Sequence, residues 1–225
     1  MVKKSGYFKS PENANKSLKS DAKTLTLVKR YAVLSSSELL RMIELKTDRL
    51  VLRQWKKSDY FAFAEMTADP LVMRFFPKVL SQIESDQLAS KIESLINDNG
   101  WGFWAVELKE TSTFIGFVGL HYQDQDIPNA PFTEIGWRLS SKYWGVGYAP
   151  EAAQAALKFA FEELNETAVY AFTTTVNQPS RNVMTKIGMI DIKQNFNHPK
   201  LSDDHELVRH CLYRISKEMW RKSTA

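Results

Sequence analysis

The sequence predicts a single domain of mixed α/β (α+β) class, in which mostly antiparallel strands alternate with helices. Residues 49–55 alternate apolar and polar side chains with period two, which is typical of a half-buried strand. Two further runs, 101–108 and 113–121, are rich in β-forming residues and are separated by a short polar turn, as in a hairpin. Residues 85–96 place their apolar side chains on one helical face, and residues 150–164 form the clearest helical segment.

The first half of this domain follows the order strand, helix, helix and hairpin. After the first strand, Ser58 or Asp59 would cap a helix over residues 60–67. An Asp-Pro pair at 69–70 predicts a break, because the residue before a proline disfavours helical geometry. The Asn-Asp-Asn-Gly sequence at 97–100 predicts the turn that leads from the second helix into the hairpin.

The second half continues with strands on both sides of the long helix. A strand is expected at 132–140, and β-forming residues at 168–175 predict another. Ser180 would cap a short helix that Gly188 ends, because glycine favours the left-handed conformation after a helix. The last strand is expected at 207–215. With 225 residues and 44% apolar side chains, the chain can bury a core around these elements without disulfides.

Positive charge is concentrated at the beginning of the chain. Residues 1–42 contain nine basic and three acidic residues, whereas the remainder contains 21 basic and 23 acidic residues. The near-neutral remainder argues against a nucleic-acid-binding body. No stretch reaches the roughly 18 apolar residues of a membrane-spanning helix, and the single cysteine, Cys211, excludes a disulfide framework and cysteine-rich metal sites. We therefore expect a cytoplasmic protein in which residues 43–225 form the domain and Cys211 belongs to its core.

The basic arm, residues 1–42, carries several open interpretations. Its first part, 1–24, is rich in Lys, Ser and Asn, and this composition predicts disorder, whereas 25–42 could form a short helix. The missing apolar segment of 7–15 residues disfavours a secretory signal. A transit peptide stays open, because the arm is rich in Ser and poor in acids, although it prefers Lys to Arg. A solvated tail and an RNA or membrane contact are the remaining alternatives.

The segment before the long helix has the features of an anion-binding loop. Gly145 and Gly147 precede Pro150, which suits the first helical position. Free backbone N–H groups and the positive end of the helix dipole would point at the same place, and glycines would let a phosphate approach closely. An ordinary tight turn is the alternative, because two glycines before a helix are a weak signal.

Three kinds of phosphate-binding loop compete for this segment. A dinucleotide fingerprint needs Gly or Ala where Pro150 stands, and no opening βαβ unit surrounds the loop. A P-loop needs Lys and Ser or Thr after its last glycine, and these are missing. The third kind is the diphosphate loop of acyl-CoA-binding acyltransferases.

Four motifs in register carry a resemblance to that third group. They are residues 47–53 (TDRLVLR), 134–139 (EIGWRL), 143–152 (YWGVGYAPEA) and 177–189, which begins NQPSRN and ends KIGM. Their order and spacing closely resemble the GNAT superfamily of N-acetyltransferases in its RimJ/RimL-type branch, over about residues 44–216. The stretch at 68–77 and the C-terminal tail resemble a bacterial subgroup of unassigned substrate.

The resemblance implies acetyl-CoA as the acetyl donor and no metal. In the family the fourth and fifth strands splay apart, and the pantetheine arm lies between them. The residues that would then bind the pantetheine are Ile135, Gly136, Trp137, Arg138 and Leu139. The backbone amides that would bind the diphosphate belong to Trp144, Gly145, Val146, Gly147, Tyr148 and Ala149. Asn177 and Asn182 would also contact the donor, the alternatives being a turn residue and a surface polar group.

The resemblance also implies direct transfer to a primary amine, either of a small molecule or of a peptide or protein N-terminus. Glu134 would act as a base through water, unless it is only a surface or ion-paired residue. Met184 stands where the family often has a general-acid tyrosine, and methionine cannot donate a proton. That role would pass to Ser180, for which a purely capping role is the alternative.

Several aromatic residues would face the acceptor in this fold. They are Phe75, Phe76, Trp104, His121 and Tyr122, with Pro77 and Trp101 beside them. The alternative is that Trp101, Trp104 and Phe75 belong to the core, and His121 is also a second candidate base. The spacing of His198, His205 and His210 matches no metal-ligand pattern. A monomer or homodimer is expected, and the rival functions are a non-catalytic acyl-CoA-binding module and an RNA-associated protein that uses its basic arm.

Overall fold

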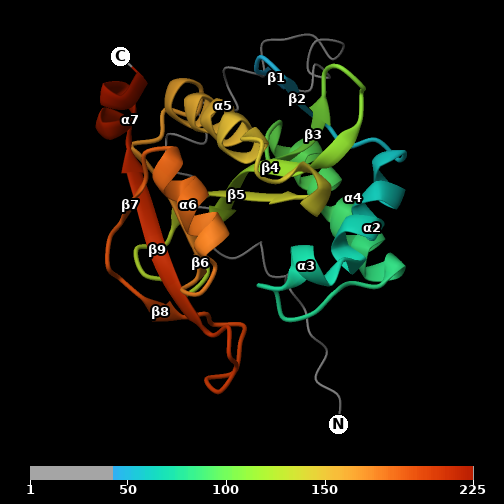
Figure 1. Cartoon of the computed structure of the whole chain (residues 1–225). Coiled ribbons are helices and arrows are strands. Elements are labelled where there is room, and N and C mark those ends of the chain that lie inside the picture. Colours follow the sequence, from blue (N-terminus) through green and yellow to red (C-terminus); the bar gives the residue numbers. More distant parts are fainter. Residues whose placement is uncertain (1–42, 225) are drawn as a thin grey trace. The chain divides into compact units, whose positions relative to one another are not determined.

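A nine-stranded sheet runs through residues 43–224, the part of the chain that this computed structural model describes (Figure 1). The strand order is β1-β2-β3-β4-β5-β6-β9-β7, and β8 pairs with β9. Neighbouring strands are antiparallel except for β5 and β6, which run parallel. The bounds are β1 Leu45–Lys46, β2 Leu50–Arg53, β3 Phe103–Leu108, β4 Phe114–Gln123, β5 Phe132–Leu139, β6 Ala168–Thr174, β7 Ile190–Asp191, β8 Phe196–Asn197 and β9 Arg209–Ser216. The predicted class, a mixed and mostly antiparallel α/β sheet flanked by helices, is confirmed.

Helices flank this sheet. Their bounds are α2 Asp59–Ala68, α3 Pro70–Met73, α4 Gln82–Asn99, α5 Tyr148–Glu162, α6 Gln178–Lys186 and α7 Lys217–Thr224, with a short 3-10 turn, η2, at Ser141–Tyr143. Among the described residues, no helix is both long and apolar enough to cross a membrane. The expectations for residues 1–42 lie outside the described part of the chain.

The two faces of the central strands carry different helices. On one face Trp104 of β3 packs edge-on against Phe159 of α5, with ring centroids 5.4 Å apart. On the other face Phe117 of β4 lies 6.1 Å from Phe63 of α2. Because Trp104 pairs with Val118, the neighbour of Phe117, α5 and α2 cover opposite faces of the sheet. Figure 1 shows α5 crossing the central strands, with α2 and α4 side by side to one side.

Local capping explains the length of α4. Ser81 accepts from the backbone N–H of Glu84, and Glu84 accepts in return from the backbone of Ser81, which forms a capping box. Gly100 follows the last helical residue with φ of 78°, and its N–H donates to Ile96. The helix therefore begins three residues before the predicted range and ends three residues after it.

A buried ion pair holds β2 to α2 and β3. Arg53 donates to both carboxylate oxygens of Asp59, at 2.7 and 2.9 Å, and also contacts Glu107. The side chains of Arg53 and Asp59 are 6% and 3% exposed. Ser58 stands at the N-cap position of α2, but its side chain makes no capping hydrogen bond. The predicted cap is therefore wrong for Ser58, and Asp59 pairs with arginine instead.

Two predicted helix starts are also wrong. Helix α5 begins at Tyr148, so Pro150 is its third residue rather than its first. Helix α6 is capped by Asn177, whose side chain accepts from the backbone N–H of Ser180, so Ser180 lies inside the first turn. Apart from β2, which lies within the predicted strand 49–55, the elements of two to four residues and the C-terminal helix α7 escaped sequence-based prediction because they are too short or too polar for a periodic pattern.

Candidate active site

Strands β5 and β6 separate after a single pair of residues. Within the described residues their parallel pairing is limited to Glu134 with Tyr170, although β5 continues to Leu139. On its other edge, β5 pairs with β4 along its whole length. Residues 135–139 therefore have no strand partner on the edge of β5 that faces β6. The splayed arrangement expected from the sequence is confirmed.

The loop that follows β5 presents unpaired amides. Gly145 and Gly147 have φ angles of 81° and 88°, a region that favours glycine, and Gly147 is the N-cap of α5. Among the described residues, the amides of residues 145–149 donate no hydrogen bond to backbone or side chains. A Cβ at Gly145 would meet nothing within 4 Å, so backbone conformation rather than space requires that glycine.

Neighbouring elements hold this loop from two sides. Ser141 donates its hydroxyl hydrogen to Asp69, the N-cap of α3, at 2.8 Å. Trp144 donates its indole N–H to the carbonyl oxygen of Leu139 at 2.8 Å, which turns the ring back towards β5. The Arg74 guanidinium lies 5.7 Å from the centre of the Trp144 ring. The loop conformation is therefore set before any anion arrives.

Glu134 occupies the other end of β5. It lies opposite His121 of β4, so both side chains share one face of the sheet. Gln123 donates its amide N–H to Glu134 Oε2 at 3.1 Å. Burial raises the pKa of Glu134 to about 7, and the Gln123 hydrogen bond and the charge of Lys200 oppose this only partly. A carboxyl group with this pKa can accept and release a proton near neutral pH.

His121 is a second titratable group beside Glu134. Its ring stacks on Phe103 with centroids 5.9 Å apart. Burial lowers the pKa of His121, the charge of Asp124 raises it, and those of Lys200 and Lys91 lower it further. The imidazole is therefore neutral at physiological pH, in which form one ring nitrogen can accept a proton.

Residues 49–190 match the acetyltransferase (GNAT) domain family. The chain belongs to this family. Over 179 residues it is 30% identical to the uncharacterized N-acetyltransferase YnaD of Bacillus subtilis, covering 79% of this chain and 99% of that protein. Over 91 residues, 39% of this chain and 37% of the relative, it is 40% identical to the FsC-acetyl coenzyme A-N(2)-transacetylase of Aspergillus fumigatus. The solved GNAT-family acetyltransferase from Bacillus anthracis has a TM-score of 0.65 and 29% identity, covering 78% of this chain and 99% of that one.

In this acetyltransferase, the other two residues predicted to bind acetyl-CoA are Asn177, the N-cap of α6, and Asn182, within α6. The side chain of Asn177 is engaged at both ends: Oδ1 accepts from the Ser180 amide at 3.2 Å, and Nδ2 donates to Thr173 at 2.9 Å. Asn182 is exposed and accepts from Gln178 at 2.7 Å. Any contact between Asn177 and acetyl-CoA must therefore use the second N–H of Nδ2 or the second lone pair of Oδ1.

The proton-donor candidates on α6 differ sharply in accessibility. Met184 is 1% exposed and belongs to the core. The hydroxyl of Ser180, which is half-buried, makes no hydrogen bond to another described residue. A hydroxyl is available in the first turn of α6, whereas the position of the missing tyrosine is closed to a ligand.

The predicted acceptor residues do not form one cluster. Trp104 is fully buried under α5, on the face opposite to Glu134, so its assignment to the acceptor slot is wrong. Phe76 lies on the Glu134 side, where the Arg138 guanidinium is 3.9 Å from its ring centre. Tyr122 is 56% exposed, and with His121 it lines a cavity of about 180 Å³ between α4 and the β3–β4 hairpin.

The remaining predicted residues are Phe75, Trp101 and Cys211, which lie in three different surroundings. Phe75 is half-buried beneath the Arg74 guanidinium, 4.7 Å away. Trp101 is half-buried in the wall of the cavity. Cys211 is buried, as expected, and burial raises its pKa. Within residues 43–224, no three His, Cys, Asp or Glu side chains are placed to hold a metal ion.

Sequence-based reasoning missed three residues that act on the site. Gln123 reaches Glu134 only because the strand register brings them together, and no sequence pattern reveals that register. Lys200 lies in the segment between β8 and β9, where no periodic signal exists. Arg49 stands in one of the recognised motifs, which could have drawn attention to it.

Proposed function

We propose that this acetyltransferase moves the acetyl group of acetyl-CoA to a primary amine, carried by a small molecule or by a peptide or protein N-terminus. One observation carries the proposal: free amides of residues 145–149 lie beyond one end of β5, and Glu134 lies near its other end. Between them, β5 has an unpaired edge. An extended donor with a diphosphate at one end and a thioester at the other fits this arrangement.

The chain offers matching groups along the length of the donor. The amides of Gly145, Val146, Gly147, Tyr148 and Ala149, at the positive end of α5, would bind the diphosphate. The unpaired edge at 135–139 would hydrogen-bond the pantetheine amides as a neighbouring strand would. Acetyl-CoA would supply the acetyl group as a thioester, whose oxygen a backbone N–H of β5 would polarise.

Glu134 would act as the base. An alkyl ammonium must lose a proton before its nitrogen can form the new C–N bond. The Glu134 carboxylate would take that proton directly or through one water, and its pKa of about 7 suits both uptake and release. His121, the cross-strand partner, would be the alternative acceptor for this proton.

Ser180 would complete the proton balance. When the C–S bond breaks, the electron pair stays on sulfur and the thiolate must be protonated. Ser180 has a hydroxyl without other partners among the described residues, whereas Met184 has no proton to give. The hydroxyl would pass the second amine proton to the sulfur.

The acceptor would enter on the face that carries Glu134. Phe76 offers aromatic surface there for the apolar stem of an amine, and the carboxylate attracts its ammonium group. Tyr122 pairs with Thr133, so its side chain is on the opposite face and it would contact an acceptor only at the edge of the sheet. The name of the Aspergillus relative describes acetyl transfer from coenzyme A to an N(2) position, which supports a nitrogen atom as the acceptor.

A thiol-release assay with acetyl-CoA tests this proposal against alkyl amines, polyamines, aminoacyl compounds and peptides. We expect amine-dependent release of CoA thiol, reduced at least about 100-fold in kcat by Glu134→Gln. The matched control is Glu163→Gln, an exposed glutamate just after α5. Tight binding of acetyl-CoA without release for any amine would instead support the non-catalytic acyl-CoA-binding module.

A further inference from the structure

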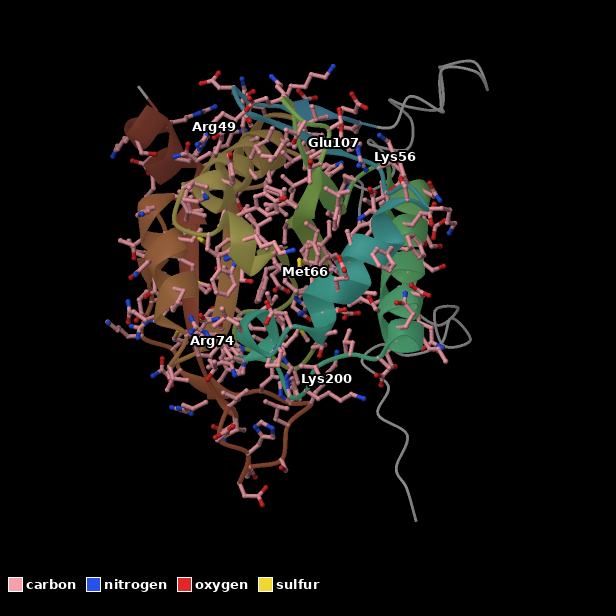
Figure 2. All side chains as sticks on the ribbon, turned by 45° about the vertical axis from the view of Figure 1, so that its right-hand side comes forward. Arg49, Lys56, Met66, Arg74, Glu107 and Lys200 are labelled. Atoms are coloured by element: carbon pink, nitrogen blue, oxygen red, sulfur yellow. The ribbon has the colours of Figure 1, made fainter. Side chains whose placement is uncertain are left out.

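An ion-pair network beside the diphosphate loop is not used by the proposed chemistry. Arg49, immediately before β2, donates from Nε to Glu151 Oε2 at 2.7 Å, and its Nη2 lies 2.6 Å from the same oxygen. Its Nη1 donates to the carbonyl oxygen of Val146 at 3.0 Å. The guanidinium also lies 4.5 Å from the ring centre of Tyr148. Figure 2 shows Arg49 well separated from Arg74 and Lys200.

The first effect of this network is electrostatic. Glu151 lies in the first turn of α5, so its charge is close to the place where an anionic diphosphate would bind. Thr47 donates to Oε1 at 2.5 Å and the Arg49 amide donates to the same oxygen at 3.0 Å. Partial burial alone would raise the pKa of Glu151, but these bonds and the Arg49 charge lower it. The carboxylate is therefore ionised, and its charge is compensated by Arg49.

The second effect is geometric. In a trans peptide the C=O and N–H groups point in opposite directions. The only cis peptide bond among the described residues joins Ala130 and Pro131, so the bond between Val146 and Gly147 is trans. Because Arg49 holds the Val146 carbonyl, the Gly147 N–H is directed away from Arg49. The same hydrogen bond thus orients one of the amides expected to bind the diphosphate.

We propose that Arg49 is a positioning residue for the diphosphate of acetyl-CoA. It orients the Gly147 amide through Val146, and it removes the repulsion that Glu151 would exert on the anion. This inference rests on the proposed function, because it assumes that the loop binds the donor. Arg49 acts through other groups and does not touch the reacting atoms.

The test compares two thioesters by calorimetry. Acetyl-CoA contains the diphosphate, whereas S-acetylpantetheine lacks it. We expect Arg49→Met to weaken acetyl-CoA binding about 10- to 100-fold, which is the usual effect of losing hydrogen bonds from a charged group. Binding of S-acetylpantetheine should not change. Arg49→Lys, which cannot reach Glu151 and Val146 together, should lie between wild type and Arg49→Met.

Two further variants separate the electrostatic effect from the geometric one. Adding Glu151→Gln to Arg49→Met should recover part of the lost acetyl-CoA affinity, because the uncompensated charge is gone. Lys158→Met, on the exposed face of α5 and far from its first turn, is the control and should bind both thioesters as wild type does. In turnover, Arg49→Met should raise KM for acetyl-CoA with little change in kcat.

The outcomes separate failure of this inference from failure of the proposed function. Equal acetyl-CoA affinity of wild type and Arg49→Met would overturn the role of Arg49, and so would an equal loss for both thioesters. If wild type binds acetyl-CoA but acetylates no amine, the proposed function fails while the positioning role stands or falls on the binding data. Thermal melting checks that each variant is folded.

Discussion

Replacing Glu134 by glutamine should stabilise the protein at alkaline pH. The folded state raises the pKa of this carboxyl from the ordinary 4.5 to about 7, mainly by burial. The folded protein therefore binds the Glu134 proton more tightly than the unfolded chain does. By linkage, this residue's contribution to stability decreases as pH rises from about 4.5 and becomes constant above about 7. Glutamine keeps the shape and the contact to Gln123 but carries no charge.

The size of the effect follows from the two pKa values. At pH 8 the ionised Glu134 destabilises the fold by about 3 kcal/mol, and at pH 5 by less than about 1 kcal/mol. The advantage of Glu134→Gln over wild type should therefore be about 2 kcal/mol greater at pH 8 than at pH 5. For a domain of this size that difference corresponds to about 4–8 °C in Tm.

The assay is thermal unfolding of wild type and Glu134→Gln at pH 5 and pH 8 in the same ionic strength. Glu163→Gln is the control, because solvent screens an exposed charge and its effect should be small at both pH values. If Tm of Glu134→Gln differs from wild type by the same amount at both pH values, Glu134 does not titrate as the structure requires. The base assignment would then lose its physical basis.

Four other predictions follow from the same geometry. The kcat/KM for acetyl transfer should rise about tenfold per pH unit below pH 7 and level off above it, as Glu134 ionises. A profile without this inflection would contradict the assignment of Glu134 as the base. Gly147→Glu should abolish acetyl-CoA binding in calorimetry, because the position has positive φ and the new charge repels the diphosphate; unchanged affinity would refute the loop assignment. Asp59→Ala should cost about 3–5 kcal/mol in denaturant unfolding by leaving Arg53 buried and poorly compensated. Met184→Tyr should destabilise the fold by about 1–3 kcal/mol without a gain in kcat, because that position is closed; faster turnover would show that it reaches the thiol.

The fold was predictable where the sequence is periodic. The hairpin at β3–β4, the strand β5 and the helix α5 each carry a pattern long enough to decide their type. The loop at 145–149 was predictable only together with the motifs around it, because two glycines before a helix are a weak signal alone; both glycines have a positive φ. These local signals cover the proposed donor end of the site.

The residues at the acceptor end could not be predicted in the same way, because their positions depend on strand register and on the face of the sheet to which each side chain points. Neither is encoded in the local sequence. Trp104 and His121 are both aromatic residues of the hairpin, yet they point to opposite faces, so only one lies on the Glu134 side. The N-cap of α6 was assigned to Ser180 because serine caps well, but Asn177 also caps well and lies three residues earlier. Arg49 contacts Val146, which lies more than 90 residues further along the chain, so only the structure reveals this contact.

Because β5 and β6 pair only through Glu134 and Tyr170, the sheet consists of two blocks of strands that are weakly joined to each other. One block contains β1 to β5, and the other contains β6 to β9. A pantetheine chain bound between β5 and β6 would supply hydrogen bonds that β5 lacks on that edge. Binding of acetyl-CoA would therefore also hold the two blocks together. Amide exchange should then slow on β5 when acetyl-CoA is added, and the melting temperature should climb with the logarithm of its concentration.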